Sequence, residues 1–128
     1  MSDLADEWRR KAEEDFSVAV GLLRRRKVPA DAVCFHSQQA AEKYLKAILQ
    51  REGIPFGKIH DLEELLRTIG SRAGPLALLQ DDLKLLSDYA VRYRYPGFDA
   101  TTRQAREAVR ALRRVRATAR VLLQPSRA

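Results

Sequence analysis

The stretch Ala32–Arg51 constrains the fold more than any other part of this chain. It contains neither glycine nor proline and consists mostly of good helix formers, so it predicts one long, uninterrupted helix. At about 100° per residue, its apolar side chains fall on one arc of that helix. The middle of this arc holds the small residues Ser37, Ala40 and Ala41. Because small residues let a second helix approach closely, we expect this to be the central helix of a bundle.

The opposite arc of the central helix is a narrow polar stripe, which is either a solvated face or a binding surface. Its members are His36, Gln39, Glu42, Lys43, Lys46 and Gln50. Asp15, earlier in the chain, lies at the edge of another apolar arc. A carboxylate that is buried there needs a partner, and Lys43 or an arginine from another helix is the candidate.

The composition is that of one ordinary globular domain. A chain of 128 residues can bury a self-sufficient core, and its 45% hydrophobic and 32% charged residues argue against disorder. The single cysteine, Cys34, excludes a disulfide within the chain and a cysteine-based zinc site. Met1 is followed by a polar segment rather than by a signal peptide or membrane span, so we expect a cytoplasmic protein without a membrane partner. The net charge of +7 permits a nucleic acid, a nucleotide or an acidic protein as partner.

Four further segments carry helical periodicity and are bounded by capping residues, glycine or proline. They run from Ser2 or Asp3 to about Lys27, from Asp61 to Ile69, from about Leu76 to Val91, and from Asp99 or Thr101 to about Leu123. No segment alternates with period two for long enough to predict a strand. The sequence therefore predicts an all-α fold. We expect an up-and-down helical bundle of about five helices, three long and two short, in a single domain over residues 1–128.

The last of these helices carries arginines along one side, which we call the basic ridge. Its members are Arg103, Arg106, Arg110, Arg113 and Arg120. Like charges at these spacings repel by a few tenths of a kcal/mol per pair. One interpretation is therefore a surface kept for an anionic partner. The other is a solvated face that is partly paired with acidic residues from elsewhere, such as Asp81 and Asp82.

The segment Arg92–Gly97 combines two guanidinium groups, two tyrosine rings and a Pro-Gly turn. One interpretation is a loop that stacks a base and holds a phosphate through Arg92, Arg94 and Tyr95. The other is a loop whose tyrosines pack against the core while an arginine neutralises a nearby aspartate.

The two imidazoles, His36 and His60, belong to no metal-binding motif. Cys34 and His36 are two residues apart on a helix, so they cannot face each other as nucleophile and base. The chain also has no glycine-rich phosphate loop and no GxSxG sequence. We therefore expect no catalytic residue, no metal site and no cofactor.

Taken together, these motifs resemble the HEPN family (higher eukaryotes and prokaryotes nucleotide-binding domain), in its prokaryotic stand-alone form. Four segments carry the resemblance in the expected order: Trp8-x6-Asp15, Phe35–Ala47, His60-Asp61-Leu62 and Arg94-Tyr95-Pro96. The resemblance implies an up-and-down helical bundle, commonly a homodimer. This agrees with the helix pattern found independently.

Many members of this family are ribonucleases of toxin systems, in which a histidine follows an arginine after four to six residues. Neither Arg92 nor Arg94 has a histidine at that distance, and neither His36 nor His60 follows an arginine at that distance. RNA cleavage needs a base and an acid near the 2′-hydroxyl. The resemblance therefore implies binding rather than catalysis for this chain.

From the resemblance we expect a non-catalytic nucleotide-binding or partner subunit that works with a small nucleotidyltransferase, in a toxin–antitoxin type of module. The candidate residues for binding a nucleotide, RNA or another anion are His36, Gln39, Lys43, Lys46, His60, Arg92, Arg94 and Tyr95. A homodimer or higher homo-oligomer is expected, with its seam on the small residues of the central and last helices. Two alternatives stay open. They are a HEPN ribonuclease toxin that uses His36 or His60 in a non-standard active site, and a dimeric protein-interaction module whose basic ridge meets an acidic protein.

Overall fold

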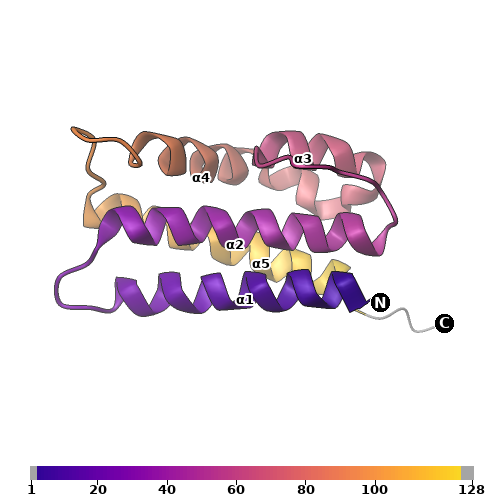
Figure 1. Cartoon of the computed structure of the whole chain (residues 1–128), viewed down its shortest axis with the longest axis horizontal. Helices are drawn as coiled ribbons and strands as arrows, with labels where there is room; N and C mark the ends of the chain where they lie inside the picture. The colour runs from indigo at the N-terminus through magenta and orange to yellow at the C-terminus, as the bar shows by residue number, and fades with distance from the viewer. Residues whose placement is uncertain (1–2, 125–128) are drawn as a thin grey trace.

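The computed structural model describes residues 3–124, and every regular element among them is a helix. The elements are α1 (Asp3–Leu23), α2 (Ala30–Arg51), α3 (Leu62–Ile69), the 3₁₀ segment η1 (Gly70–Leu79), α4 (Gln80–Arg92) and α5 (Thr102–Leu122). Figure 1 shows α1 and α2 running antiparallel side by side, with α3 and α4 along the other side of α2. The predicted all-α bundle of three long and two short helices is confirmed.

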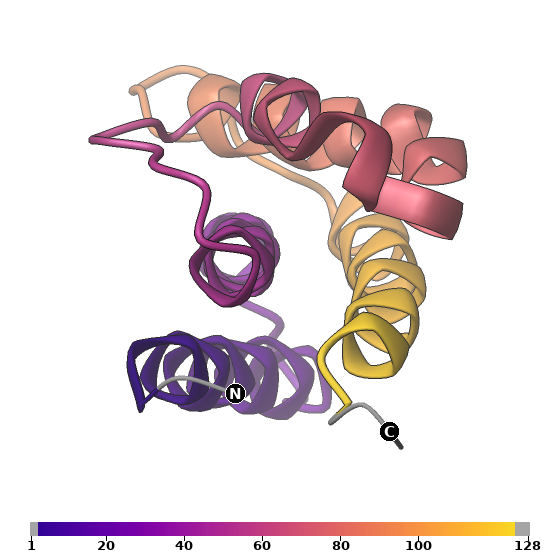
Figure 2. The ribbon, with the colours of Figure 1, turned by 90° about the vertical axis from the view of Figure 1, so that its right-hand side faces the viewer.

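Helix α2 lies in the centre of this bundle, as its sequence predicts. It packs against α1, α3, α4 and α5, and Figure 2 shows it end-on between α1 and the α3–α4 layer, with α5 alongside. The helix begins at Ala30, two residues earlier than predicted. Pro29 is its N-cap, and the Pro29 carbonyl already accepts the backbone N–H of Val33.

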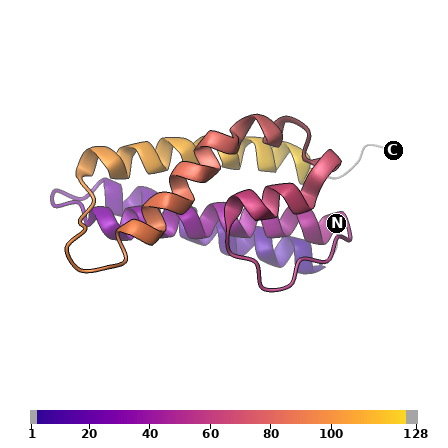
Figure 3. The ribbon, with the colours of Figure 1, turned by 90° about the horizontal axis from the view of Figure 1, so that it is seen from above.

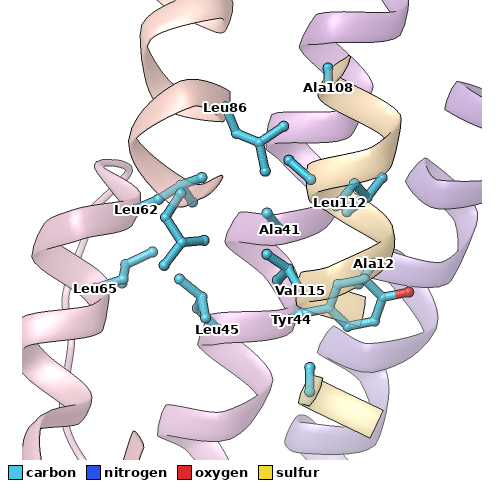
Figure 4. Packing of buried hydrophobic residues seen from close by; sticks show 14 of the residues in the cluster. Ala12, Ala41, Tyr44, Leu45, Leu62, Leu65, Leu86, Ala108, Leu112 and Val115 are labelled. Carbon is cyan, nitrogen blue, oxygen red and sulfur yellow. The ribbon is translucent and has the colours of Figure 1, made fainter. Parts of the chain in front are cut away.

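The core forms on both sides of α2. On one side Leu45 points toward Leu62 and Leu65 of α3, as Figure 4 shows. On the other side Leu112 and Val115 of α5 are completely buried. Helix α1 contributes the fully buried alanines Ala5, Ala12 and Ala19. Their seven-residue spacing gives α1 a flat face that can lie close to α2.

The small residues of the central helix are buried by other helices of the same chain. Ser37, Ala40 and Ala41 are all 0% exposed, and so are the alanines on the inner face of α5, Ala105, Ala108, Ala111 and Ala119. The expectation that they form a seam between two copies is therefore wrong. The described helices of the same chain already fill that space.

Two predicted boundaries differ from the structure. Helix α1 ends at Leu23 rather than near Lys27, because the following amides bond three residues back and tighten the last turn. Helix α4 begins at Gln80 rather than near Leu76. The preceding residues form a 3₁₀ segment that Gly74 interrupts with a φ of 54°, a conformation that glycine adopts without strain.

The helix caps fix where the loops leave the bundle. The Asp61 carboxylate accepts the backbone N–H groups of Glu63 and Glu64 at 2.8 and 3.1 Å. Thr101, rather than Asp99, caps α5 in a reciprocal capping box with Gln104. The alternative α1 cap, Ser2, lies outside the described residues, and α1 starts at Asp3. Figure 3 shows the α2–α3 connection and the loop after α4 on one side of the bundle and α5 on the other. Within residues 3–124, no helix has both the length and the apolar character needed to cross a membrane.

Candidate functional site

A cleft of about 460 Å³ opens between α2, the loop before α3 and the C-terminal end of α4. Its volume lies in the range of small-molecule sites. Helix α2 supplies the floor, and the two loops of Figure 3 supply the rim. The lining residues are Gln38, Gln39, Glu42, His60, Asp61, Ser87, Ala90, Val91 and Arg94.

The floor of the cleft is built on a buried carboxylate, Glu42, which is only 4% exposed. Gln38 Nε2 donates to it at 3.1 Å, Lys46 Nζ at 3.1 Å and His60 Nδ1 at 3.2 Å. A buried charge is stable only when it is paired and hydrogen-bonded. These three donors meet that requirement and fix the carboxylate in place.

Lys46, predicted as an anion-binding residue on the polar stripe, is itself buried at 5% exposure. Its ammonium pairs with Glu42 and lies 5.3 Å from the ring centre of Trp8 and 6.0 Å from that of Phe56. Each such contact between a cation and an aromatic face adds stabilisation. Through these contacts the ammonium links α1, α2 and the α2–α3 loop. The prediction that it faces an anion in solvent is wrong.

The rim offers two groups that can meet an anion. The His60 side chain is 74% exposed, although its Nδ1 is held by Glu42. Arg94 is exposed at the edge of the cleft, and among residues 3–124 no carboxylate pairs with it. The guanidinium therefore keeps its full hydrogen-bonding fork for a ligand phosphate or carboxylate.

The other flank of the polar stripe meets α1. Asp15 accepts a hydrogen bond from His36 Nδ1 at 2.9 Å and forms an ion pair with Lys43, so the predicted partner of Asp15 is confirmed. Asp15 thereby fixes the ring of His36 with Nε2 as its remaining hydrogen-bonding atom. Gln39 lies between this flank and the cleft, because it follows His36 by less than one helical turn and lines the cleft.

The structure does not bring the remaining candidates to the cleft. Arg92 and Tyr95 instead line an adjoining depression with Phe98, which shares only Val91 with the cleft. The basic ridge runs along α5, on the side of the bundle away from the α2–α3 loop in Figure 3. Its five arginines are all exposed, and among the described residues only Arg103 has a carboxylate partner, Glu107 at 3.5 Å.

Sequence reasoning missed the cleft role of Gln38, which lies beside the predicted stripe. The signal was available, since Gln38, Glu42 and Lys46 are spaced four residues apart and therefore stack along one line of the helix. Ser87 was missed because it is a single hydroxyl on α4. Its side chain accepts the backbone N–H of Leu62 at 3.3 Å, which fastens the start of α3 to α4.

A second polar cluster joins α1, α2 and α5 away from the cleft. The hydroxyl of the fully buried Tyr44 donates to Glu13 at 2.8 Å, and the Arg116 guanidinium binds the same carboxylate at 2.9 Å. Burial raises the pKa of Glu13, but hydrogen bonds from Arg116 and Tyr44 outweigh burial and hold this pKa below its ordinary value. Burial, followed by the bond to Glu13, raises the pKa of Tyr44. Figure 4 shows the Tyr44 hydroxyl pointing away from the leucine cluster.

The single cysteine has an unreactive thiol. Cys34 is fully buried, and burial together with nearby Asp31 and Glu107 raises the pKa of its thiol to about 12. A thiol that stays protonated at neutral pH is neither a good nucleophile nor a good metal ligand. In addition, residues 3–124 contain no group of three or more His, Cys, Asp or Glu side chains placed to hold a metal ion.

Comparison with known proteins agrees with this architecture. The model of the HEPN domain family matches residues 5–122. The fold is similar to the crystal structure of TT1696 from Thermus thermophilus, with a TM-score of 0.81 and 24% identity over 95% of this chain and 100% of that one. It is also similar to ST0689, described as an archaeal HEPN homologue, with a TM-score of 0.77 and 25% identity over 96% of this chain and 100% of that one. No protein of curated function matches the sequence significantly. Because the family model spans nearly the whole chain, this protein belongs to the HEPN domain family.

Proposed function

We propose that this protein is a non-catalytic, nucleotide-binding HEPN subunit whose ligand occupies the cleft between α2, the loop before α3 and the C-terminal end of α4. The single observation that carries the proposal is the arrangement of that cleft. Its floor is the network around Glu42, and its rim holds His60 and Arg94, whose guanidinium has no carboxylate partner among residues 3–124. A nucleotide has the matching chemistry, since its phosphates suit the cationic rim and its base suits the hydrogen-bonding floor.

Binding without catalysis is supported by what the chain offers chemically. The arginine–histidine spacing of the family's ribonucleases is absent from the sequence. The one thiol is buried and protonated, and the cleft carboxylate Glu42 is already engaged by three donors. A general base needs a free lone pair near the reacting group. The Glu42 oxygens therefore have few free lone pairs with which to accept a proton from a substrate.

The test is isothermal titration with the four ribonucleoside triphosphates. We expect at least one to bind to the wild-type protein and Arg94→Ala to weaken that binding about tenfold or more, as for a lost charge-assisted contact. Arg92→Ala is the matched control, since this arginine lies two residues away but outside the cleft. Absence of binding for every triphosphate, or equal losses in the two variants, would reject the proposal.

The second half of the proposal concerns the partner, a small nucleotidyltransferase in a toxin–antitoxin type of module. It is supported by family membership and by the missing ribonuclease spacing. The first thing to inspect is the neighbouring gene. If it encodes a minimal nucleotidyltransferase, co-expression and size-exclusion chromatography with light scattering should give a stable complex. The same measurement on this chain alone tests the expected homodimer.

One observation favours a ribonuclease instead, namely the His36–Asp15 pair at 2.9 Å. A carboxylate on Nδ1 fixes the tautomer and orientation of an imidazole, which leaves Nε2 to meet a substrate. An RNA-degradation assay with His36→Ala and His60→Ala decides between the two functions. RNA that the wild-type protein leaves intact counts against the ribonuclease, and cleavage that His36→Ala abolishes counts against a purely binding subunit.

A further inference from the structure

The two neighbouring amides of the cleft, Gln38 and Gln39, form a hydrogen-bonded chain that starts at Glu42. Gln38 Nε2 lies 3.1 Å from a Glu42 carboxylate oxygen and 3.3 Å from the backbone carbonyl oxygen of His60. Gln39 Nε2 lies 2.8 Å from Gln38 Oε1. Gln38 is 7% exposed, so these contacts occupy a nearly dry position.

The chain fixes which way each amide points. Both groups that face the Gln38 nitrogen are acceptors only, a carboxylate and a backbone carbonyl, so the NH₂ group of Gln38 must face them. Its carbonyl oxygen then faces Gln39. Because that oxygen can only accept, Gln39 must present its own NH₂ group. Reversing either amide would bring two acceptors together in a low-dielectric site, which is costly.

The last amide in the chain keeps two groups for a ligand. Gln39 uses one of its N–H groups on Gln38, and among residues 3–124 its other N–H and its Oε1 have no partner. Gln39 is half-buried and lines the cleft. It therefore presents one donor and one acceptor side by side, in an order that the buried Glu42 carboxylate sets.

We infer that Gln39 reads the base of the bound nucleotide and selects adenine. The inference rests on the proposed nucleotide binding. At the Watson–Crick edge of adenine, a glutamine amide forms two hydrogen bonds, accepting from the 6-amino group and donating to N1. Hypoxanthine presents the reverse order, with an acceptor at position 6 and a donor at N1. A freely rotating amide could flip to match it, but the chain from Glu42 prevents the flip.

The experiment measures the Kd values of ATP and of ITP, which differ only at this edge of the base. For the wild-type protein we expect ATP to bind tighter by roughly five- to a hundredfold, the range for one bidentate base contact. In Gln39→Leu the ratio of the two Kd values should fall to about one, mainly through weaker ATP binding. Gln50→Leu changes an amide of the same helix that does not line the cleft, so it should leave the ratio unchanged. Because each ratio is measured within one variant, a partly unfolded sample does not alter it.

The outcomes separate this inference from the proposed function. If neither ATP nor ITP nor any other triphosphate binds, both fail. If ATP and ITP bind the wild-type protein equally well, or ITP binds tighter, the cleft still takes nucleotides but Gln39 does not select adenine. If ATP is preferred and Gln39→Leu keeps the preference, another residue reads the base and the inference is overturned.

Discussion

The cleft floor and the basic ridge of α5 use charge in opposite ways. In the floor, the single carboxylate of Glu42 is nearly buried and receives hydrogen bonds from Gln38, Lys46 and His60. Along the ridge, five arginines are exposed, and among the described residues only Arg103 has a carboxylate partner. In the floor, the hydrogen bonds hold each polar group in one orientation relative to the others. Most of the ridge arginines have no carboxylate partner among residues 3–124, so a high local charge does not by itself mark a site.

The same contrast occurs within α5. Arg116 faces α1, binds Glu13 and lies 4.1 Å from the ring centre of Phe16. Arg110 and Arg106, on the outer side of the same helix, have no such contacts among residues 3–124. Partners decide the role of an arginine here, and the partners are set by which helix lies opposite.

The largest effect should come from Glu42→Ala. Removing one member of a buried ion pair leaves Lys46 charged and uncompensated, so unfolding free energy should fall by about 3–5 kcal/mol in urea denaturation. The double variant Glu42→Ala with Lys46→Met should recover much of the loss, because the buried charge is gone. A loss below about 1 kcal/mol in the single variant would mean that the floor is no more constrained than the ridge.

Arg116→Ala should have an intermediate effect of about 1–2 kcal/mol. It removes the bidentate partner of Glu13 and the cover over Phe16 at once. Arg113→Ala is the control, since Arg113 also lies over Phe16, at 5.4 Å, but has no carboxylate partner among residues 3–124. Equal losses of stability in the two variants would show that stacking alone accounts for the effect.

The Glu13 carboxylate should make stability depend on pH in the acid range. Its pKa is lowered in the folded protein, so the stabilisation is present above the unfolded pKa of about 4.5 and is lost as pH falls through the folded pKa. Urea unfolding between pH 3 and pH 6, taken as a test range, should therefore show a shallower pH dependence for Glu13→Gln than for the wild-type protein. Parallel curves would contradict this role of Glu13.

The smallest effect should come from the basic ridge. The double variant Arg106→Ala with Arg110→Ala should change unfolding free energy by less than about 0.5 kcal/mol. The sign at low salt should be stabilising, since two like charges four residues apart are removed. A loss of more than about 1 kcal/mol would mean that the ridge is held by contacts as specific as those of the cleft floor.

Most of the fold could be predicted from the sequence because helical periodicity is a local signal. The central helix, the Asp15–Lys43 ion pair and the Thr101 cap follow from spacings along single helices or from one obvious need for a partner. The 3₁₀ segment Gly70–Leu79 does not. Its apolar residues suit an α-helix equally well, and the kink at Gly74 depends on a backbone conformation.

The candidate site was less predictable, because its environment comes from distant segments. The polar stripe of α2 contains both Lys43 and Lys46, and the sequence pattern predicts the same exposed environment for the two lysines. Trp8 and Phe56 cover Lys46, and they come from α1 and the α2–α3 loop. Arg94 lines the cleft and Arg92 does not, since Arg92 is the last residue of α4 whereas Arg94 lies in the loop beyond it.

The buried thiol of Cys34 can report how often this bundle opens locally. The side chain is fully covered, its pKa is about 12, and the sequence has no other cysteine. A thiol reagent can therefore modify the chain at one position only, and only while α2 is uncovered. The labelling rate then measures how often the centre of the bundle opens. A ligand that binds beside α2 should slow this rate in proportion to its occupancy, so binding can be followed without a label on the ligand.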